Sequence, residues 1–274
     1  MRTLFIIIAL IFSTATYAQS ATDFYAEGMA AKTAEKYELA VTNFKKATEQ
    51  KPTNGDAWYE LGWCYNELQK FEDALPALNK AKIYLRDEPK VFYESGYAND
   101  YLDKTDEALK DFKKCIELDP TYTIAYQDIA NIYFDVEKDY TLALENYNAV
   151  VKNTEEDEIG SELWYKKGYC ENDLELYDDA LVSLKKSVAL DSAYGPAVKE
   201  LGYAYYGVKK YNEALTYLQK SLKLEESNAA YYYCGLCYIA LKQKNKAREI
   251  YNKLVEVKSP DAEKFLELLN AMKE

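Results

Sequence analysis

Histidine is absent from the 274-residue chain. This absence excludes Ser-His-Asp and Cys-His nucleophile systems, His-containing zinc motifs and acid–base catalysis by imidazole, so that only carboxylate, Lys, Tyr or Cys chemistry is left. The ten glycines form no phosphate-binding loop, and paired carboxylates such as Asp178–Asp179 fall in turns or on outer helix faces. We therefore predict that the protein is not an enzyme and that it holds no metal and no cofactor.

Positive charge is scarce. The chain has 34 Lys and Arg residues against 46 Asp and Glu residues, which gives a net charge of −12. An acidic surface repels the phosphate backbone of nucleic acids unless its few cations are tightly clustered. Nucleic acid is therefore not expected as a partner.

Long apolar runs are also scarce, and the one that bears on localisation is at the N-terminus. Arg2 precedes an uninterrupted apolar run from Leu4 to Phe12, and small residues then lead to a favourable cleavage point before Gln19. The run is too short to span a bilayer, which needs roughly 18 residues, so it favours a secretory signal peptide over residues 1–18 rather than a membrane anchor. Because no Cys lies near the cleavage point, a lipoprotein anchor is not indicated. No later stretch of the sequence is apolar enough to cross a membrane. We expect an exported protein, periplasmic or extracellular, with a mature charge of −13.

What the sequence does contain is an internal repeat. Small residues recur at intervals of 33 to 38 residues, in two parallel series, and a large apolar residue follows each member of the second series by four places. The first series is Gly28, Gly62, Gly96, Ala130, Gly168, Gly202 and Gly235. The second is Ala40, Ala74, Ala108, Ala143, Ala180, Ala214 and Ala247. The large residues are Phe44, Leu78, Phe112, Tyr147, Leu184, Leu218 and Tyr251.

One repeat reads Trp58-x-x-Leu61-Gly62-x-x-Tyr65, followed by Ala74-x-x-x-Leu78-x-x-Ala81. This pattern resembles the tetratricopeptide repeat (TPR) family, and the resemblance covers seven units over roughly residues 21 to 258. Pro52, Pro120 and Pro260 lie at or near the family's terminal proline. The fourth unit departs from the pattern, with Ala130 in place of Gly and one extra turn residue.

The resemblance implies an all-α fold, a right-handed α-solenoid of antiparallel helix pairs in a TPR-like superhelix. Units one to four are predicted over residues 19–151 and units five to seven over 162–258, with a capping helix in 259–274. The acidic segment 152–161 is expected to be a solvated linker and a flexible joint between the two subarrays. Pro76, inside the second helix of unit two, is expected to shorten or kink the start of that helix.

Five cysteines in a protein that is expected to be exported raise the question of redox chemistry. On the repeat frame they fall at packing positions, which favours buried structural thiols, because free Cys packs as a small hydrophobe. Cys234 and Cys237 form a Cys-x-x-Cys pair, so a disulfide between them stays an alternative. A zinc site would need further ligands that the sequence does not offer.

In the TPR family the concave wall is built from the first helix of each unit. The matching positions form a Tyr-rich acidic surface: Tyr25, Met29, Tyr59, Glu60, Trp63, Tyr93, Glu94, Tyr97, Gln127, Asp128, Asn131, Tyr165, Lys166, Tyr169, Lys199, Glu200, Tyr203, Tyr232, Tyr233 and Leu236. From these we select as the peptide-binding groove Tyr59, Glu60, Trp63, Tyr93, Glu94, Tyr97, Tyr165, Tyr169 and Tyr203. The hot spot is predicted between units two and three, where Glu60 and Glu94 would select a positive charge.

We therefore predict a non-catalytic scaffold that binds an extended partner segment, with basic, Pro or aromatic side chains, through stacking and cation–π contacts. The family's clamp for a C-terminal carboxylate is not expected, because acids outnumber the lysines of this surface. Two alternatives stay open. Tyrosine faces also stack on sugars, which would suit an accessory protein of a cell-surface polysaccharide system. A structural subunit of an envelope assembly would instead use the convex or edge surfaces.

Overall fold

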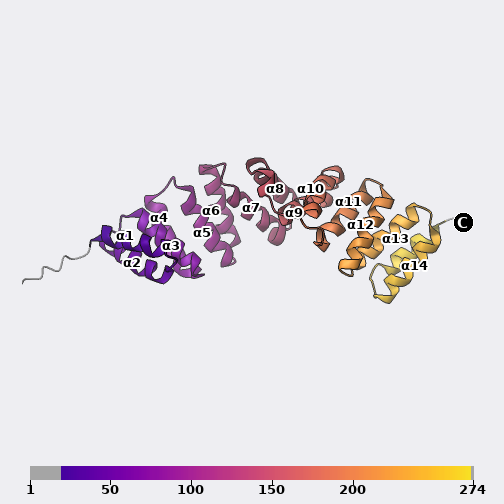
Figure 1. The fold of residues 1–274 in the computed structure, drawn as a ribbon, viewed down its shortest axis with the longest axis horizontal. Helices are drawn as coiled ribbons and strands as arrows, with labels where there is room; N and C mark the ends of the chain where they lie inside the picture. Colours follow the sequence, from indigo (N-terminus) through magenta and orange to yellow (C-terminus); the bar gives the residue numbers. More distant parts are fainter. Residues whose placement is uncertain (1–19, 273–274) are drawn as a thin grey trace, which may run out of the picture. The chain divides into compact units, whose positions relative to one another are not determined.

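The computed structural model describes residues 20–272, so the predicted signal peptide lies outside the described residues. Within this range the chain is all-α, with fifteen α-helices and no strand (Figure 1). It divides into two compact units, the first ending at Asp111 and the second beginning at Phe112. The predicted all-α fold is confirmed.

The first unit is a stack of helices in chain order. It contains α1 (Ala21–Thr33), α2 (Tyr37–Gln50), α3 (Gly55–Glu67), α4 (Phe71–Tyr84), α5 (Pro89–Tyr101) and the first part of α6 (Thr105–Leu118). Each helix from α1 to α4 packs on the next, and α3 also contacts α5. The first helices of successive repeats, such as α3 and α5, therefore lie side by side.

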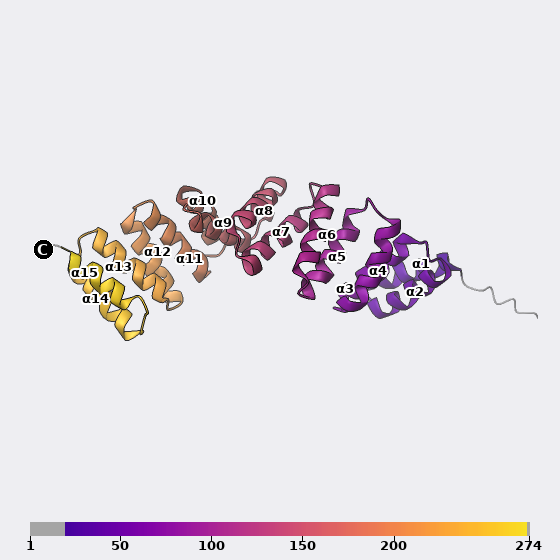
Figure 2. The same cartoon turned by 180° about the vertical axis from the view of Figure 1, so that it is seen from behind.

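The second unit repeats this arrangement. After the end of α6 it contains α7 (Thr123–Ile132), α8 (Tyr140–Asn153), α9 (Ser161–Asp173), α10 (Tyr177–Leu190), α11 (Gly195–Gly207), α12 (Tyr211–Leu224), α13 (Asn228–Ala240), α14 (Lys244–Glu256) and α15 (Ala262–Ala271). The first helices α9, α11 and α13 contact one another in turn. Helix α15 packs on α13 and α14, as a capping helix should (Figure 2). Each unit is thus an α-solenoid of helix pairs.

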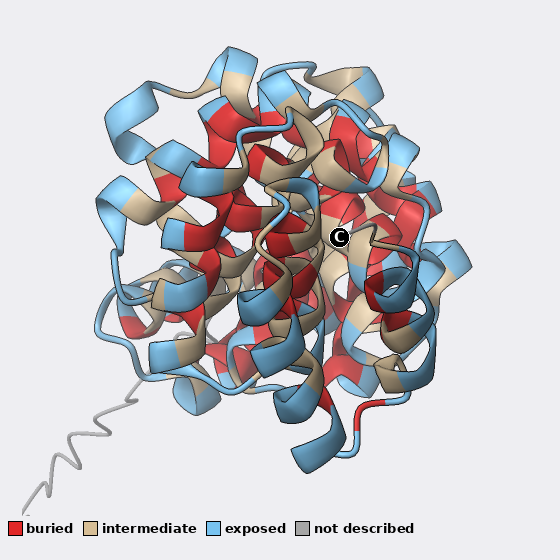
Figure 3. Cartoon of the chain, turned by 90° about the vertical axis from the view of Figure 1, so that its right-hand side faces the viewer, coloured by how far each residue is buried: buried red, intermediate tan, exposed pale blue. Residues whose placement is uncertain are grey.

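The helix pairs are held by one repeated close approach. A Cβ atom added to Gly62 would lie 2.5 Å from Leu78 Cγ, and one added to Gly202 would lie 2.7 Å from Leu218 Cγ. Leu78 and Leu218 are fully buried. In these repeats the small residue of the first helix receives the large residue of the second helix, whereas in the last repeat a Cβ on Gly235 would lie 2.4 Å from the Phe265 ring of α15 and not against Tyr251. The buried residues gather where helices face each other (Figure 3).

A second recurring device is the turn inside each pair. The residue at its centre has a positive φ and is not glycine: Glu35, Gln69, Asp103, Lys138, Glu175, Lys209 and Lys242. After α3, for example, Gln69 N donates to Asn66 O at 2.8 Å and Lys70 N donates to Tyr65 O at 2.8 Å, which is the Schellman pattern. This turn reverses the chain and starts the second helix.

Two irregularities of the sequence have different outcomes. The prediction that Pro76 shortens its helix is wrong: α4 starts at Phe71 and has 14 residues, as α2 does. Pro76 is exposed, so the carbonyl oxygen that loses its backbone partner can bind water. The extra residue of unit four is absorbed by a π-helical turn, η1 (Tyr133–Glu137), which widens the end of the first helix.

The acidic segment 152–161 contains a 3₁₀ turn, η2 (Glu156–Glu158), whose residues are all exposed, as expected for a solvated segment. It is also tied to the stack: Ile159 is buried, and Lys186 Nζ lies 2.7 Å from Glu156 Oε2. The boundary between the two compact units lies inside α6 and does not coincide with this segment.

All five cysteines are buried and none forms a disulfide. Burial raises the pKa of Cys64, Cys170, Cys234 and Cys237 to about 12, because the apolar surroundings disfavour the thiolate. The thiolate is the reactive form of cysteine. These side chains therefore serve as packing groups, as predicted from their places on the repeat frame.

We expect Gly62→Ala to lower the free energy of unfolding by about 1 to 3 kcal/mol, because the new methyl group overpacks Leu78. Gly160→Ala is the matched control, since an added Cβ there meets nothing within 4 Å. Urea unfolding followed by circular dichroism measures both. Equal stability of the two variants would contradict the close approach.

We expect the five thiols to be unreactive toward a thiol-specific reagent in the folded protein and to react fully in denaturant, because burial suppresses the thiolate. The rate of labelling measures this. Rapid labelling of Cys234 and Cys237 under native conditions would restore a redox role for that pair.

Candidate functional site

The first helices meet each other along one row of side chains, which we call the inter-repeat ladder. The ladder joins two positions of neighbouring repeats. The residue four places after the small residue of one repeat, such as Lys32 after Gly28, faces the residue two places before the small residue of the next repeat, such as Glu60 before Gly62. Its pairs within the first unit are Lys32–Glu60 and Asn66–Glu94. Its pairs within the second unit are Phe134–Lys166, Asn172–Glu200 and Tyr206–Tyr233.

The pair between α1 and α3 is an internal cation site. Lys32 Nζ lies 2.6 Å from Glu60 Oε2 and 3.7 Å from the centroid of the Trp63 ring. Glu60 is only 8% exposed. An acid and an aromatic face thus hold one ammonium group of the protein itself, the combination that favours a cation–π contact.

The pair between α3 and α5 has the same frame with an asparagine in the lysine's place. Asn66 Nδ2 donates to Glu94 Oε2 at 2.8 Å and to the Glu94 carbonyl oxygen at 3.0 Å. Tyr97 follows Glu94 as Trp63 follows Glu60. The ring of Tyr101 lies 4.7 Å from that of Tyr97 and stacks on Phe71 at 4.6 Å.

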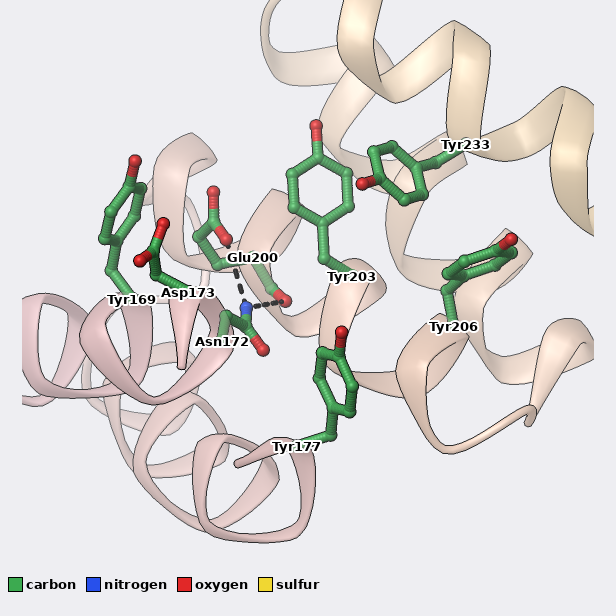
Figure 4. A pocket seen from close by; sticks show the side chains of 8 residues that line it. All are labelled: Tyr169, Asn172, Asp173, Tyr177, Glu200, Tyr203, Tyr206 and Tyr233. Atoms are coloured by element: carbon green, nitrogen blue, oxygen red, sulfur yellow. Dashed lines mark hydrogen bonds between the residues drawn. The ribbon is translucent and has the colours of Figure 1, made fainter. Parts of the chain in front are cut away.

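The pair between α9 and α11 repeats the asparagine–glutamate contact. Asn172 Nδ2 donates to Glu200 Oε2 at 3.0 Å and to the Glu200 carbonyl oxygen at 2.9 Å, as the dashed lines of Figure 4 show. Burial raises the pKa of both Glu94 and Glu200 to about 7, since the asparagine's hydrogen bond compensates the lost hydration only in part.

Beside this second pair lies a pocket of about 290 Å³. Helices α9, α11 and α13 and the start of α10 supply its walls: Tyr169, Asn172, Asp173, Tyr177, Glu200, Tyr203, Tyr206 and Tyr233 (Figure 4). The Tyr203 and Tyr233 rings are 4.4 Å apart, and the Tyr206 ring stands edge-on to Tyr233 at 5.2 Å. Five tyrosines, two acids and one amide thus surround a space that no lysine or arginine lines.

The predicted groove residues lie on the first helices, but not all are accessible. Tyr59 and Glu60 are buried, and Glu60 is paired with Lys32, while Trp63, Tyr93, Glu94 and Tyr97 are half-buried. Of the three positions selected in the second unit, Tyr169 and Tyr203 line the pocket. Tyr165 lies one turn before Tyr169 and packs edge-on to Tyr194 at 5.1 Å.

Glu200 and Tyr233 belong to the broad surface predicted from the sequence, whereas Asn172, Asp173, Tyr177 and Tyr206 were not predicted. The position four places after the small residue was the available signal, because it carries Asn in two of the three repeats whose next repeat has Glu two places before its small residue. Only the contact across to the next first helix shows its meaning.

Known protein families and solved structures share the repeat of this chain. Models of the tetratricopeptide repeat match residues 25–88, 89–122 and 199–263, together more than half of the chain. No curated protein sequence matches it. The chain belongs to the tetratricopeptide repeat family, and its fold is that of a protein–protein interaction scaffold.

Solved structures with the same fold have low sequence identity to this chain. The C-terminal part of a TPR repeat-containing protein from Cytophaga hutchinsonii has a TM-score of 0.62 at 17% identity and covers 89% of this chain and 99% of its own. A TPR protein from Parabacteroides merdae has 0.56 at 17%, covering 92% and 98%. YrrB, described as a TPR protein with an unusual peptide-binding site, has 0.60 at 19%, covering 74% and 97%.

The raised pKa of Glu200 predicts a pH dependence of stability. Between about pH 4.5 and 7 the unfolded chain loses this proton before the folded chain does, so the free energy of unfolding falls as pH rises through this window, by up to about 3 kcal/mol. Glu200→Gln cannot ionise, so we expect it to be more stable than wild type at pH 8 and about equal at pH 4.5.

Chemical unfolding across this pH range measures the difference. Glu72→Gln, at an exposed position of α4, is the control and should follow wild type. A Glu200→Gln variant that loses as much stability with rising pH as wild type would contradict the raised pKa.

Proposed function

We propose that this protein is a non-catalytic scaffold that holds an extended segment of a partner protein against the first helices of its repeats. The observation that carries the proposal is the Tyr-lined acidic pocket formed by three successive first helices and the start of α10. Tyrosine and tryptophan bury large areas at low entropy cost and dominate binding hot spots. The chain offers such rings where helices from different repeats converge.

The charge of the protein supports a basic or aromatic partner segment. The chain carries a net charge of −12, and both charged residues that line the pocket, Asp173 and Glu200, are acids. A negative surface attracts a positive segment and speeds its association. The N-terminal sequence supports export of the mature chain, which would place the partner in the periplasm or outside the cell. Among residues 20–272 no helix is long and apolar enough to span a bilayer.

The arrangement of the binding rings gives a direct test. The mature chain would be immobilised, partners captured from envelope extract would be identified, and the bound segment would be mapped with peptides. We expect Tyr169→Ala and Tyr206→Ala each to weaken the mapped peptide by about 2 kcal/mol, the usual hot-spot scale. Tyr84→Ala, at an exposed position of α4, is the matched control and should bind as wild type.

Salt separates this function from the alternative of glycan binding, which the five tyrosines of the pocket also favour. Affinity for a basic peptide should fall as ionic strength rises from roughly 50 to 500 mM, because salt screens the attraction. Sugar binding should be nearly insensitive to salt. A partner that binds all three Tyr variants equally would contradict the proposal and point to the convex or edge surfaces.

A further inference from the structure

Three groups of three residues, which we call triads, occupy the same repeat positions along the ladder. The triads differ in the side chains that surround them. Counted from the small residues, the triads are Lys32–Glu60–Trp63, Asn66–Glu94–Tyr97 and Asn172–Glu200–Tyr203. All three combine a buried or half-buried glutamate with an aromatic ring one turn further on. They differ in what lies against that acid and that ring.

In the first triad the protein supplies its own cation. Lys32 reaches across from α1 to Glu60 and to the face of Trp63, at 2.6 and 3.7 Å. In the second triad Asn66 replaces the lysine, and the ring of Tyr101 stacks on Phe71 and packs against Tyr97. The ring of this triad thus has a second aromatic ring packed against it.

In the third triad the acid has only a longer ion pair, 3.9 Å, with Lys199 of its own helix, and no ring stands in the place of Tyr101. Asn172 again stands in the lysine's place, and the position that matches Tyr101 is Gly207. A Cβ atom at Gly207 would lie 2.4 Å from the ring of Tyr177, the residue that matches Phe71. Tyr177 therefore packs against bare backbone instead of against a second ring, and the 290 Å³ pocket opens in front of Glu200.

The polar groups of this pocket suit a positive guest. The Tyr203 hydroxyl oxygen is buried and has no hydrogen-bond partner among the described residues. Asp173 adds a second acid to the wall. The nearest cation, Lys199, has its Nζ 3.9 Å from Glu200 Oε1, but its side chain lines a separate hollow with Glu225 and Glu226.

We propose that the pocket between α9, α11 and α13 is a binding site for a single lysine or arginine side chain of the partner segment, in the way that Lys32 is held by Glu60 and Trp63. The proposal rests on the proposed function for the source of that side chain. The ring faces would surround the cation, and Glu200, Asp173 and the Tyr203 oxygen would accept its hydrogen bonds.

The test uses capped amino acids as probes, so that it does not depend on knowing the partner. Nα-acetyl-lysine methylamide and its arginine counterpart would be titrated into the mature protein, with the neutral norleucine analogue as the reference, and binding followed by NMR. We expect both cations to bind at least tenfold more tightly than norleucine. Equal binding of the three probes would overturn the proposal.

Two variants localise the binding. Glu200→Gln removes the charge without changing shape and should weaken the lysine probe at least fivefold, whereas Asn172→Lys supplies an internal cation like Lys32 and should abolish binding. Glu94→Gln and Asn66→Lys make the same changes in the second triad, and both variants should bind the lysine probe as wild type does. Circular dichroism checks that all four fold. Wild-type affinity in Glu200→Gln and Asn172→Lys would overturn the site.

Protonation offers an independent readout. A bound cation favours the ionised carboxylate, so the lysine probe should bind more tightly at pH 8 than at pH 6, and Glu200→Gln should remove this difference. The groups that face Glu200 are Asn172, Asp173, Tyr165 and Tyr169 of α9, Lys199 and Tyr203 of α11, and Tyr233 of α13. No pH effect on the wild type would count against a cation beside Glu200.

Failure of this site and failure of the proposed function give different results. A mapped partner peptide that binds wild type and Asn172→Lys equally, but loses affinity in Tyr169→Ala, would leave the scaffold standing and remove the cation site. If the protein binds the lysine probe but captures no partner segment, the cation site is supported and the proposed scaffold function is contradicted.

Discussion

The close approach of a first helix to the second helix of its own repeat, as at Gly28, Gly62, Gly168 and Gly202, is the contact on which the other features depend. It requires a residue without a side chain, or nearly so, on one helix and a large apolar residue on the other, as Gly62 and Leu78 show. With this contact made, the two helices form one rigid pair, and the Schellman turn between them reverses the chain. The repetition of the pair aligns the first helices of neighbouring repeats, so residues about 30 places apart in sequence become neighbours.

The inter-repeat ladder is the consequence of that alignment. Its frame is constant while its chemistry varies: an ion pair at Lys32–Glu60, amide–carboxylate contacts at Asn66–Glu94 and Asn172–Glu200, and a ring pair at Tyr206–Tyr233. One scaffold thus carries different local sites without a change of fold, because each ladder pair joins only two neighbouring first helices.

Burying a glutamate beside an asparagine costs stability when the acid ionises, and the chain does this twice. The amide satisfies one carboxylate oxygen and the glutamate's own carbonyl, but it supplies no positive charge. Binding sites hold such groups ready for a partner at the expense of the free protein's stability. At Glu200 tyrosines and a second acid line a pocket, whereas at Glu94 the ring of Tyr101 packs against Tyr97.

The sequence alone predicted the repeat, the all-α solenoid of helix pairs and the packing role of the cysteines, because the spacing of small and large residues dictates these contacts locally. It also identified the first helices as a Tyr-rich acidic surface. It did not show that Lys32 already pairs with Glu60, nor that Tyr177 packs against Gly207 beside a pocket in front of Glu200. Those outcomes depend on which side chains meet across repeats, and only the tertiary structure decides that, since the partners lie on different helices.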